Sequence, residues 1–366
     1  MFTPTPSHKG GAAKHTRTIA SGLADRGWDV TVIARRADGH RLVRSRIGRA
    51  RVIEIPGFGH RLAGALAFLL LAVPLGLMRG RRASYVSLEL ASQGIVASIC
   101  AALSGRPYIG FSFSSGEGGE VENFRGSRLW PLRRRLLRRA AYLVGQTPAS
   151  AAELRAIVDD DRIAVVPTPV EAVEASPLSG EPRALFTGRL TAGKGLEGLL
   201  DTWELVLDRV TEAKLTIAGS SEGWAWGWPP NEEELKRRVA GSARLRGSVE
   251  FTGWVADVDG LLATNDVYVY PSLSEGMSNS LLEACSWLRI IVASDLPANR
   301  AVLGDDYPLL FPVGDGAAMA ERLLAAIGDE SVRAAAVEQL RERIPAFHAD
   351  AVLDQIEALL EDGRQR

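Results

Sequence analysis

The sequence predicts an α/β protein made of two Rossmann-like, doubly wound domains that face a cleft. Its 366 residues are enough for two domains, and a composition of 46% hydrophobic and 24% charged residues is ordinary for a globular enzyme. Short apolar stretches alternate with helical patterns along the whole chain. This alternation implies βαβ units and parallel sheets.

The first domain is predicted to span residues 1–167. An amphipathic helix is expected over residues 16–26, where apolar residues recur at helical spacing. Strands are expected where a short apolar run is bounded by turn residues. The expected strands are residues 28–34, 51–56, 84–90, 107–113, 141–147 and 162–167.

Residues 168–180 are predicted to form a linker, because prolines interrupt them and they lack a long apolar period. The second domain, residues 181–345, is predicted to repeat the alternation, and residues 346–366 to form a C-terminal helix. Ligands of such sheets bind beyond the carboxyl ends of the strands. The strands expected here are residues 184–190, 214–220, 248–253, 267–272, 289–295 and 309–313.

Charge is divided unevenly between the two halves. Residues 1–175 hold 25 basic and 14 acidic residues, a net charge of +11, and residues 176–366 carry −12. This predicts a first domain that faces a membrane or an anionic ligand, although two unrelated solvated surfaces would give the same charges. Cys100 and Cys285 lie far apart in apolar surroundings, which favours a reducing compartment over a disulfide or zinc framework.

Two segments of the first domain have membrane-like patterns. Residues 62–78 are a 17-residue apolar run at the lower limit for crossing a bilayer, and Pro74 and two glycines favour a buried helix instead. Residues 125–139 hold seven arginines among leucines and a tryptophan, which is typical of a basic amphipathic helix on anionic lipid. A solvated helix face is the alternative for this second segment.

The stretch SHKGGAAKH, residues 7–15, places two glycines before a helix. Small residues let a ligand approach the backbone, and a helix N-terminus favours anions. The motif GxGxxG is missing, so a dinucleotide site is weakly supported. A plain turn would explain this loop if it stood alone.

The stretch FTGRLTAGKGLEGLL, residues 186–200, carries two cations in a loop between a strand and a helix. Arg189 and Lys194 are five residues apart. Two cations at a strand end suit a diphosphate, because hydrogen bonds between charged groups are strong. A pair of solvated surface charges is the alternative.

The stretch PSLSEGMSNSLLEA, residues 271–284, contains two glutamates. Glu275 and Gly276 lie in the turn after an expected strand, and residues 277–279 would offer free N–H groups at the start of a helix. Glu283 lies on that helix among apolar neighbours, where a carboxylate is costly unless it is paired or binds a ligand. Glu275 could therefore hold a hexose and Glu283 a ribose, with the two cations on the phosphates between them.

These motifs resemble the retaining glycosyltransferases of family 4, the glycosyl transferases group 1, which have the GT-B fold. The two glutamates separated by seven residues, together with GRL…KG, are the most specific part of the resemblance. It covers almost the whole chain, through GG near the start, LFTGRL…KG, VEFTGWV, YPSLSEGMSNSLLEA and IVASDLPANR.

The resemblance implies roles for the matching residues. Arg189 and Lys194 match the pair that binds the donor's diphosphate, and Glu275 matches the acid beside the reacting carbon of the donor sugar. The two cations would stabilise the leaving diphosphate. The resemblance also implies that neither a metal nor another cofactor is needed. The remaining donor-binding positions are Gly11, Gly188, Trp254, Val255, Gly276, Met277, Ser278, Asn279 and the ribose ligand Glu283.

Three other clusters receive different interpretations. Residues 257–259 and 159–161 mimic the metal-binding Asp-x-Asp of another glycosyltransferase fold. The first lies on a helical pattern and the second in a loop before a strand, so neither is expected to bind a metal. Trp224, Trp226 and Trp228 lie in a long polar loop, where they either pack together or form an acceptor or partner surface.

The chain departs from the family pattern in two places. Many members have a histidine after the strand at residues 107–113, but here the sequence is FSFSSGEGGE, with Ser112, Ser114 and Ser115. The residue in the histidine's role is therefore left open. Only residues 1–3 stand in place of a full central strand, so we expect a start assigned too late or a truncated chain, which would expose ladder groups on neighbouring strands.

The predicted function is transfer, with retention, of a sugar from a UDP-, GDP- or ADP-sugar to a hydroxyl of a glycan or lipid-linked acceptor. Cell-surface polysaccharide or glycolipid synthesis is the expected setting. The protein is expected in the cytoplasm, with a peripheral contact to the inner membrane face as an option and no nucleic-acid partner. The alternative is a catalytically weak partner subunit of the same fold; the missing GxGxxG disfavours a nicotinamide-dependent oxidoreductase.

Overall fold

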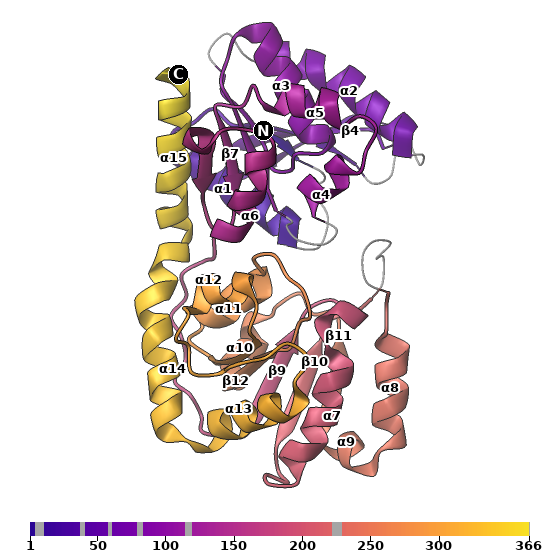
Figure 1. Cartoon of the computed structure of the whole chain (residues 1–366), viewed down its shortest axis with the longest axis vertical. Coiled ribbons are helices and arrows are strands. Elements are labelled where there is room, and N and C mark those ends of the chain that lie inside the picture. Colours follow the sequence, from indigo (N-terminus) through magenta and orange to yellow (C-terminus); the bar gives the residue numbers. More distant parts are fainter. Residues whose placement is uncertain are drawn as a thin grey trace. The chain divides into compact units, whose positions relative to one another are not determined.

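Both halves of the sequence fold around a mainly parallel sheet covered by helices (Figure 1). The computed structural model describes residues 1–3, 11–36, 41–57, 61–78, 83–113, 119–221 and 229–365. The chain divides into unit 1, Met1–Pro169 with Phe347–Arg366, and unit 2, Val170–Ala346. Each unit is described by itself below.

Unit 1 contains an eight-stranded sheet in the order β3-β4-β2-β1-β5-β6-β7-β8. Every neighbouring pair is parallel except β3 and β4, which form an antiparallel pair at one edge. The strands are β1 Phe2–Thr3, β2 Thr31–Arg35, β3 Val43–Ile47, β4 Ala50–Ile55, β5 Tyr85–Ser87, β6 Tyr108–Ser112, β7 Tyr142–Gly145 and β8 Ile163–Val165.

The six strands predicted for the first domain are confirmed, and two details are new. β3 was not predicted, because its sequence VRSRI is polar and its residues lie at an exposed edge. β1 has only two residues, yet it occupies the central place between β2 and β5. Phe2 lies opposite Ile33 and Ser87, and the Leu88 N–H donates to the Phe2 carbonyl at 3.0 Å.

Helices cover both faces of this sheet. On one face, α1 and the long C-terminal α15 pack together over a core that includes Ile19, Val32 and Ile356 (Figure 1). On the other face, α2, α3 and α5 enclose Phe68, Ala97 and other buried residues. The helices of unit 1 are α1 Gly11–Asp25, α2 Arg61–Met78, α3 Ser92–Ser104, α4 Glu120–Arg125, α5 Trp130–Leu137, α6 Pro148–Glu153 and α15 Ala349–Gln365.

Two predictions about helices of unit 1 need correction. The single basic helix predicted over residues 125–139 is wrong, because Gly126 ends α4 and α5 begins only at Trp130, with Pro131 in its first turn. The buried helix predicted over residues 62–78 is buried on one face only: Phe68 and Ala72 are inside, whereas Leu70 is 70% exposed. Among the described helices, none combines the length and apolar character needed to cross a bilayer.

Unit 2 contains a six-stranded parallel sheet in the order β11-β10-β9-β12-β13-β14. This is the doubly wound order, in which the order of strands across the sheet reverses between the first and fourth strands, here β9 and β12. All six predicted strands are confirmed. They are β9 Arg183–Thr187, β10 Lys214–Ala218, β11 Val249–Gly253, β12 Val267–Tyr270, β13 Ile290–Ser294 and β14 Leu310–Phe311.

The helices of unit 2 connect these strands and carry the chain towards α15. α13 packs on α7 and α14, and α14 also contacts α12 (Figure 1). The helices are α7 Leu196–Leu207, α8 Glu232–Gly241, α9 Ala243–Ser248, α10 Asp259–Thr264, α11 Asn279–Ser286, α12 Pro297–Leu303, α13 Gly316–Gly328 and α14 Glu330–Arg343.

The second part of the predicted linker is fixed to unit 2 by buried charges. The carboxylate of Asp266 accepts hydrogen bonds from the backbone N–H groups of Ser179, at 2.8 Å, and Gly180, at 2.6 Å. The guanidinium of Arg289 is buried and donates to the carbonyl of Ser176. Polar backbone groups of the linker are thus satisfied by side chains of the domain it enters.

Candidate functional site

The two neighbouring strands at the reversal point of the unit 2 sheet end in loops that contact each other. Residues 188–195 follow β9 and residues 271–278 follow β12. The N–H of Leu273 in the second loop donates to the carbonyl of Gly193 in the first, at 2.9 Å. Ligands of doubly wound sheets bind at this reversal point, and it holds most of the residues predicted for the site.

Glycines fix the loops after β9, β10 and β11 against one another. The N–H of Gly188 donates to the carbonyl of Ala218 at 3.0 Å, and that of Gly219 donates to the carbonyl of Gly253 at 2.7 Å. Gly219 has a φ of 142°, and a Cβ there would lie 1.7 Å from the Gly188 carbonyl oxygen. Only glycine allows this approach, so the edge is shaped by backbone contacts.

Gly195 sets the position of the predicted cation Lys194. It has a φ of 67° and ends the 3₁₀ turn Ala192–Lys194 before α7 begins. A Cβ at Gly195 would lie 2.1 Å from the carbonyl oxygen of Pro271, in the loop after β12. The second glycine of GKG therefore brings Lys194 beside the loop that carries Glu275.

Lys194 and Glu275 form an ion pair, and this is the central contact of the site. Both side chains are largely buried, with 12% and 13% of their surface exposed. The ammonium group of Lys194 also lies 3.3 Å from the hydroxyl of Tyr270 and 5.3 Å from the centroid of its ring. A cation in this position is held by charge, by a hydrogen bond and by the aromatic face.

Tyr268 and Tyr270 belong to the site but were not predicted. They are buried, project from the same face of β12 and stack with ring centroids 6.2 Å apart. Tyr268 bonds to the Thr187 hydroxyl at 2.9 Å, and burial raises the pKa of both tyrosines. The alternating VYVY in a buried strand was the available signal, because buried tyrosine hydroxyls need partners.

Arg189 lies within electrostatic reach of Glu275. Partial desolvation lowers the pKa of its guanidinium although much of the side chain is exposed, and the negative charge of Glu275 acts in the opposite direction. The structure therefore brings the three predicted catalytic residues, Arg189, Lys194 and Glu275, to one place. Two cations share one carboxylate, so the cluster carries a net positive charge.

The α11 helix begins beside this cluster and ends the second loop. Ser278 is its N-cap, and the Ser278 hydroxyl accepts a bond from the N–H of Leu281 at 3.5 Å. The first backbone bond of the helix runs from the N–H of Leu282 to the Ser278 carbonyl. The N–H groups of Asn279 and Ser280 therefore precede the intrahelical ladder, as expected at a helix N-terminus.

The other predicted donor positions are distributed around this edge. Glu283 lies one turn into α11, is half-buried and acts electrostatically on Tyr268. Gly276 is half-buried and Met277 is buried in the loop before α11. Trp254 follows Gly253 at the end of β11 and is 51% exposed, with the half-buried Val255 next to it. Gly11 belongs to unit 1, where it begins α1.

The described residues contain no group of three or more histidine, cysteine or acidic side chains arranged to hold a metal ion. Asp257 accepts the N–H of Asp259, which in turn accepts the indole N–H of Trp287, so both acids have local structural partners. Cys100 and Cys285 are free and buried. The tryptophan cluster Trp224, Trp226 and Trp228, and Ser114 and Ser115, lie outside the described residues.

The carboxyl edge of the unit 1 sheet holds a second polar cluster. The Glu120 carboxylate accepts the N–H of Leu90 at 3.0 Å, and its other oxygen is buried without a partner among the described residues. Burial, together with the proximity of Glu89, raises the pKa of Glu120 to about 8. On the same edge, His15 is buried 4.3 Å from the ring of Phe113, and desolvation lowers its pKa to about 3.

Two family models match the chain. The model described as "Glycosyl transferase 4-like domain" matches residues 10–169, and that described as "Glycosyl transferases group 1" matches residues 181–329. The chain belongs to the group 1 glycosyltransferases. The family predicted from the loop motifs is therefore confirmed, and the two matches fall in unit 1 and unit 2 respectively.

Curated glycosyltransferases resemble part of the chain. The phosphatidyl-myo-inositol mannosyltransferase of Mycolicibacterium smegmatis is 33% identical over 192 residues, which cover 50% of this chain and 47% of that protein. The O-antigen chain mannosyltransferase B of Escherichia coli is 27% identical over 158 residues, covering 43% and 39%. The matched region thus spans about half the length of these relatives or less.

Solved structures of similar fold cover nearly the whole chain. HepE of Anabaena in complex with UDP and glucose has a TM-score of 0.76 at 16% identity, covering 98% of each chain. The sucrose-phosphate synthase of Thermosynechococcus elongatus has a TM-score of 0.79 at 19% identity, covering 99% of this chain and 97% of that one. These likenesses confirm the predicted GT-B fold of this group 1 glycosyltransferase.

Proposed function

We propose that the protein transfers a sugar, with retention, from a nucleoside-diphosphate sugar to an acceptor hydroxyl in cell-surface glycan or glycolipid synthesis. One observation carries the proposal: Arg189, Lys194 and Glu275 meet at the reversal point of the unit 2 sheet, beside the N-terminus of α11. Two cations and a helix N-terminus suit a diphosphate, and a carboxylate among them suits sugar hydroxyls.

In this proposal the donor replaces an ion pair that already exists. In the structure, Glu275 balances the charge of Lys194. A diphosphate would take over Lys194 and Arg189 through charge-assisted hydrogen bonds and leave the Glu275 carboxylate to accept bonds from the donor sugar. Glu283, one turn further along α11, would accept the ribose hydroxyls, and Trp254 and Val255 would contact the base.

The chemical step would break the bond between the anomeric carbon and the diphosphate oxygen, and the electron pair would leave with the diphosphate. The acceptor oxygen would bond to the anomeric carbon from the same face and pass its proton to the departing phosphate. Arg189 and Lys194 would stabilise the charge that develops on the leaving group. These cations supply the neutralisation that a metal provides elsewhere, so activity should persist in a chelator.

The choice of substrates follows from the relatives only at the level of class. The mannosyltransferases and the UDP complex suggest a UDP-, GDP- or ADP-sugar donor and a glycan or lipid-linked acceptor. We therefore propose incubating the protein with a panel of UDP-, GDP- and ADP-sugars, with and without EDTA, and measuring nucleotide release. Binding and release with at least one donor would support the proposal. Failure of every donor would refute it and favour a non-catalytic partner subunit.

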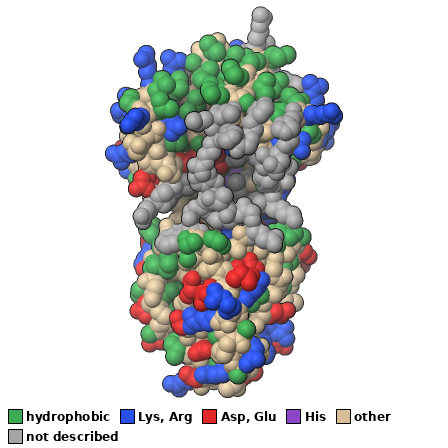
Figure 2. Space-filling view, turned by 90° about the vertical axis from the view of Figure 1, so that its right-hand side faces the viewer, with side chains coloured by type: hydrophobic (Ala, Val, Ile, Leu, Met, Phe, Trp, Pro, Cys, Tyr) green, Lys and Arg blue, Asp and Glu red, His purple; other side chains and the backbone are tan. Residues whose placement is uncertain are grey.

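We further propose that unit 1 contacts an anionic membrane at the cytoplasmic side. α2, α3 and α5 pack side by side and expose apolar side chains, while α5 adds arginines to the same surface. Figure 2 shows hydrophobic side chains gathered on this unit with lysine and arginine side chains around them. The exposed apolar residues are Leu66, Leu70, Leu71, Met78, Leu103, Leu129 and Leu132.

Vesicle sedimentation tests this membrane contact. Binding should require anionic lipid, weaken as salt rises, and fall when Leu66 and Leu70 are both replaced by serine. A matched control is Leu205→Ser, which removes an exposed leucine of unit 2. Binding that is indifferent to lipid charge and salt, or unaffected by the leucine pair, would remove the membrane proposal and leave the donor proposal intact.

A further inference from the structure

A cavity of about 930 Å³ lies at the amino edge of the unit 1 sheet, the edge opposite to the strand ends that hold Glu120 and His15. Pro107 precedes β6, Ala141 precedes β7 and Arg162 precedes β8, and all three line the cavity. The C-terminal turn of α15 closes one side with Gly363 and Arg364. We call this cavity the amino-edge pocket.

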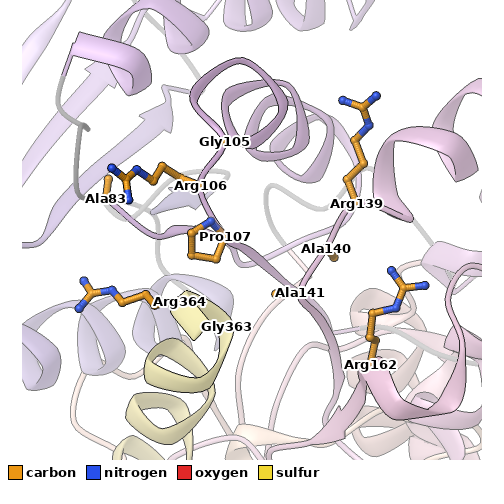
Figure 3. Close-up of a pocket in the computed structure, with 10 residues that line it drawn as sticks. All are labelled: Ala83, Gly105, Arg106, Pro107, Arg139, Ala140, Ala141, Arg162, Gly363 and Arg364. Carbon is orange, nitrogen blue, oxygen red and sulfur yellow. The ribbon is translucent and has the colours of Figure 1, made fainter. Parts of the chain in front are cut away.

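The floor of the amino-edge pocket is made of small residues and its rim of arginines. Gly105 and Gly363 have no side chain and Ala140 has only a methyl group, so these residues leave the floor open. In Figure 3 two arginines lie on one side of this floor and two on the other. The first pair is Arg106 and Arg364, and the second is Arg139 and Arg162.

The positive charge of the rim is only partly balanced. Arg162 forms an ion pair with Asp159 at 3.0 Å and donates to the Arg138 carbonyl at 2.8 Å. Arg364 donates to the hydroxyl of Ser84 at 3.2 Å, and its guanidinium lies over the ring of Trp28, 4.6 Å from the centroid; both partners are neutral. Within the described ranges, Arg106 and Arg139 have no ion pair, and no acidic residue lines the pocket.

Helix ends explain part of this arrangement. α3, α5 and α15 all end at the pocket, and arginines near a helix C-terminus complement its partial negative charge. Each helix end carries roughly half an elementary charge, so three helix ends offset about one and a half of the four guanidinium charges. Asp159 offsets one more. Positive charge therefore predominates among the residues that line a cavity large enough for a small ligand.

We propose that the amino-edge pocket binds a ligand that carries two or more neighbouring phosphate groups. A guanidinium donates two parallel hydrogen bonds to a phosphate, and arginines on opposite sides of a small-residue floor suit an anion with more than one such group. The ligand is either a soluble diphosphate or the phosphorylated head group of a lipid. This site lies in unit 1 and does not depend on the proposed donor site in unit 2.

Calorimetry with inorganic pyrophosphate on the full chain tests the soluble form of the ligand. The variant R106Q/R139Q removes two rim charges while retaining polar side chains of moderate length, and it should weaken one class of binding by roughly tenfold or more. The variant R44Q/R46Q, on the exposed edge strand β3, is the matched control for net charge and should bind like the wild type. K194M should instead weaken only the class of pyrophosphate binding that belongs to the proposed donor site. The two proposals can therefore be refuted independently.

Vesicles of phosphatidylcholine with and without phosphatidic acid test the lipid form. A loss of phosphatidic-acid-dependent binding in R106Q/R139Q, but not in R44Q/R46Q, would identify a lipid head group. A loss of pyrophosphate binding would identify a soluble ligand. If R106Q/R139Q binds both probes like the wild type, if both double variants lose binding equally, or if the wild type binds neither probe, the proposal is overturned. An unchanged thermal unfolding midpoint verifies that the variants are folded.

Discussion

The carboxyl edges of the two parallel sheets hold charge in opposite ways. In unit 2, Lys194 and Glu275 form an ion pair, and glycine contacts fix the loops that carry them. In unit 1, Glu89 and Glu120 are like-charged neighbours whose raised pKa values favour the protonated form, and His15 is held neutral. The difference lies in the side chains that follow the strands: one edge suits an anion and the other suits neutral hydroxyl groups.

The largest expected effect in this comparison comes from removing the carboxylate of Glu275 at the carboxyl edge of the unit 2 sheet. We expect Glu275→Ala to lower kcat by about a hundredfold to a thousandfold, because a group aligned with the reacting centre typically contributes about 3–4 kcal/mol to the transition state. The measurement is nucleotide release with the active donor of the panel. Asp257→Ala, an exposed acid of unit 2, is the control and should retain activity.

Glu275→Ala also leaves Lys194 without its ionic partner, which could destabilise the protein and imitate a catalytic loss. The double variant K194M/E275A separates the two effects. It removes both charges, so its thermal unfolding midpoint should be closer to that of the wild type while turnover stays lost. Turnover that survives in a folded Glu275→Ala would defeat the assignment of this residue.

The second prediction concerns the backbone contacts that fix the loops of unit 2. Gly219→Ala should lower the free energy of unfolding by on the order of 3 kcal/mol, since the new Cβ would lie 1.7 Å from the Gly188 carbonyl oxygen at a φ of 142°. Urea unfolding measures it, followed by tryptophan fluorescence, to which the buried Trp203 contributes. Gly247→Ala, where a Cβ meets nothing within 4 Å, is the control and should change stability little.

Gly219→Ala with wild-type stability would mean that the loop has room to move and that the glycine contacts do not set the site. If stability falls and donor affinity falls with it, the contacts act by positioning the cations. If the variant is as stable as the wild type but binds the donor more weakly, the glycine contacts shape the binding site without contributing to the stability of unit 2.

The sequence predicted the fold well because its signals are local. Twelve expected strands are present, and the doubly wound order of unit 2 follows from alternating apolar runs and helices. β3 was missed because an edge strand with exposed arginines has no apolar period. The basic helix was placed across Gly126 because charge and leucine spacing continue through a residue that ends the helix.

The charged residues of the candidate site could be predicted from the sequence, but its buried tyrosines could not. Arg189, Lys194 and Glu275 follow strand ends, where polar residues are informative. Tyr268 and Tyr270 were missed, because apolar neighbours on a buried strand make tyrosine look like core. The proximity of Glu89 and Glu120 comes from the pairing of β5 with β6, a long-range contact that no local pattern encodes.

The third prediction concerns Glu120 at the carboxyl edge of the unit 1 sheet. The pKa of Glu120 is raised from 4.5 to about 8, so the folded state binds more protons than the unfolded state between these values. The stability contributed by this group is therefore present below pH 4.5 and is lost as pH rises towards 8. Glu120→Gln should flatten this decline and stabilise the protein at pH 8 by on the order of 2 kcal/mol, measured by urea unfolding across pH.

His15 lies at the same edge and makes stability depend on pH in the opposite direction, so it serves as an internal comparison. Its pKa is lowered to about 3, so its stability contribution is present above pH 6.5 and is lost as pH falls towards 3. Glu120→Gln should leave this acid limb unchanged. If the variant and the wild type lose stability in parallel between pH 5 and 8, the carboxyl pair is ionised in the folded state and the contrast between the two edges fails.

The smallest expected effect is at the N-terminus of α11. Ser278→Ala removes the hydroxyl that accepts the Leu281 N–H, and replacing an N-cap serine costs about 1 kcal/mol. Ser278→Asp restores an acceptor and should recover this stability, but it places a negative charge where the donor diphosphate is proposed to bind. We therefore expect Ser278→Asp to be stable and to bind the donor more weakly than Ser278→Ala. Equal donor affinity in the two variants would indicate that the diphosphate lies elsewhere, and that α11 closes the loop without contributing to the anion site.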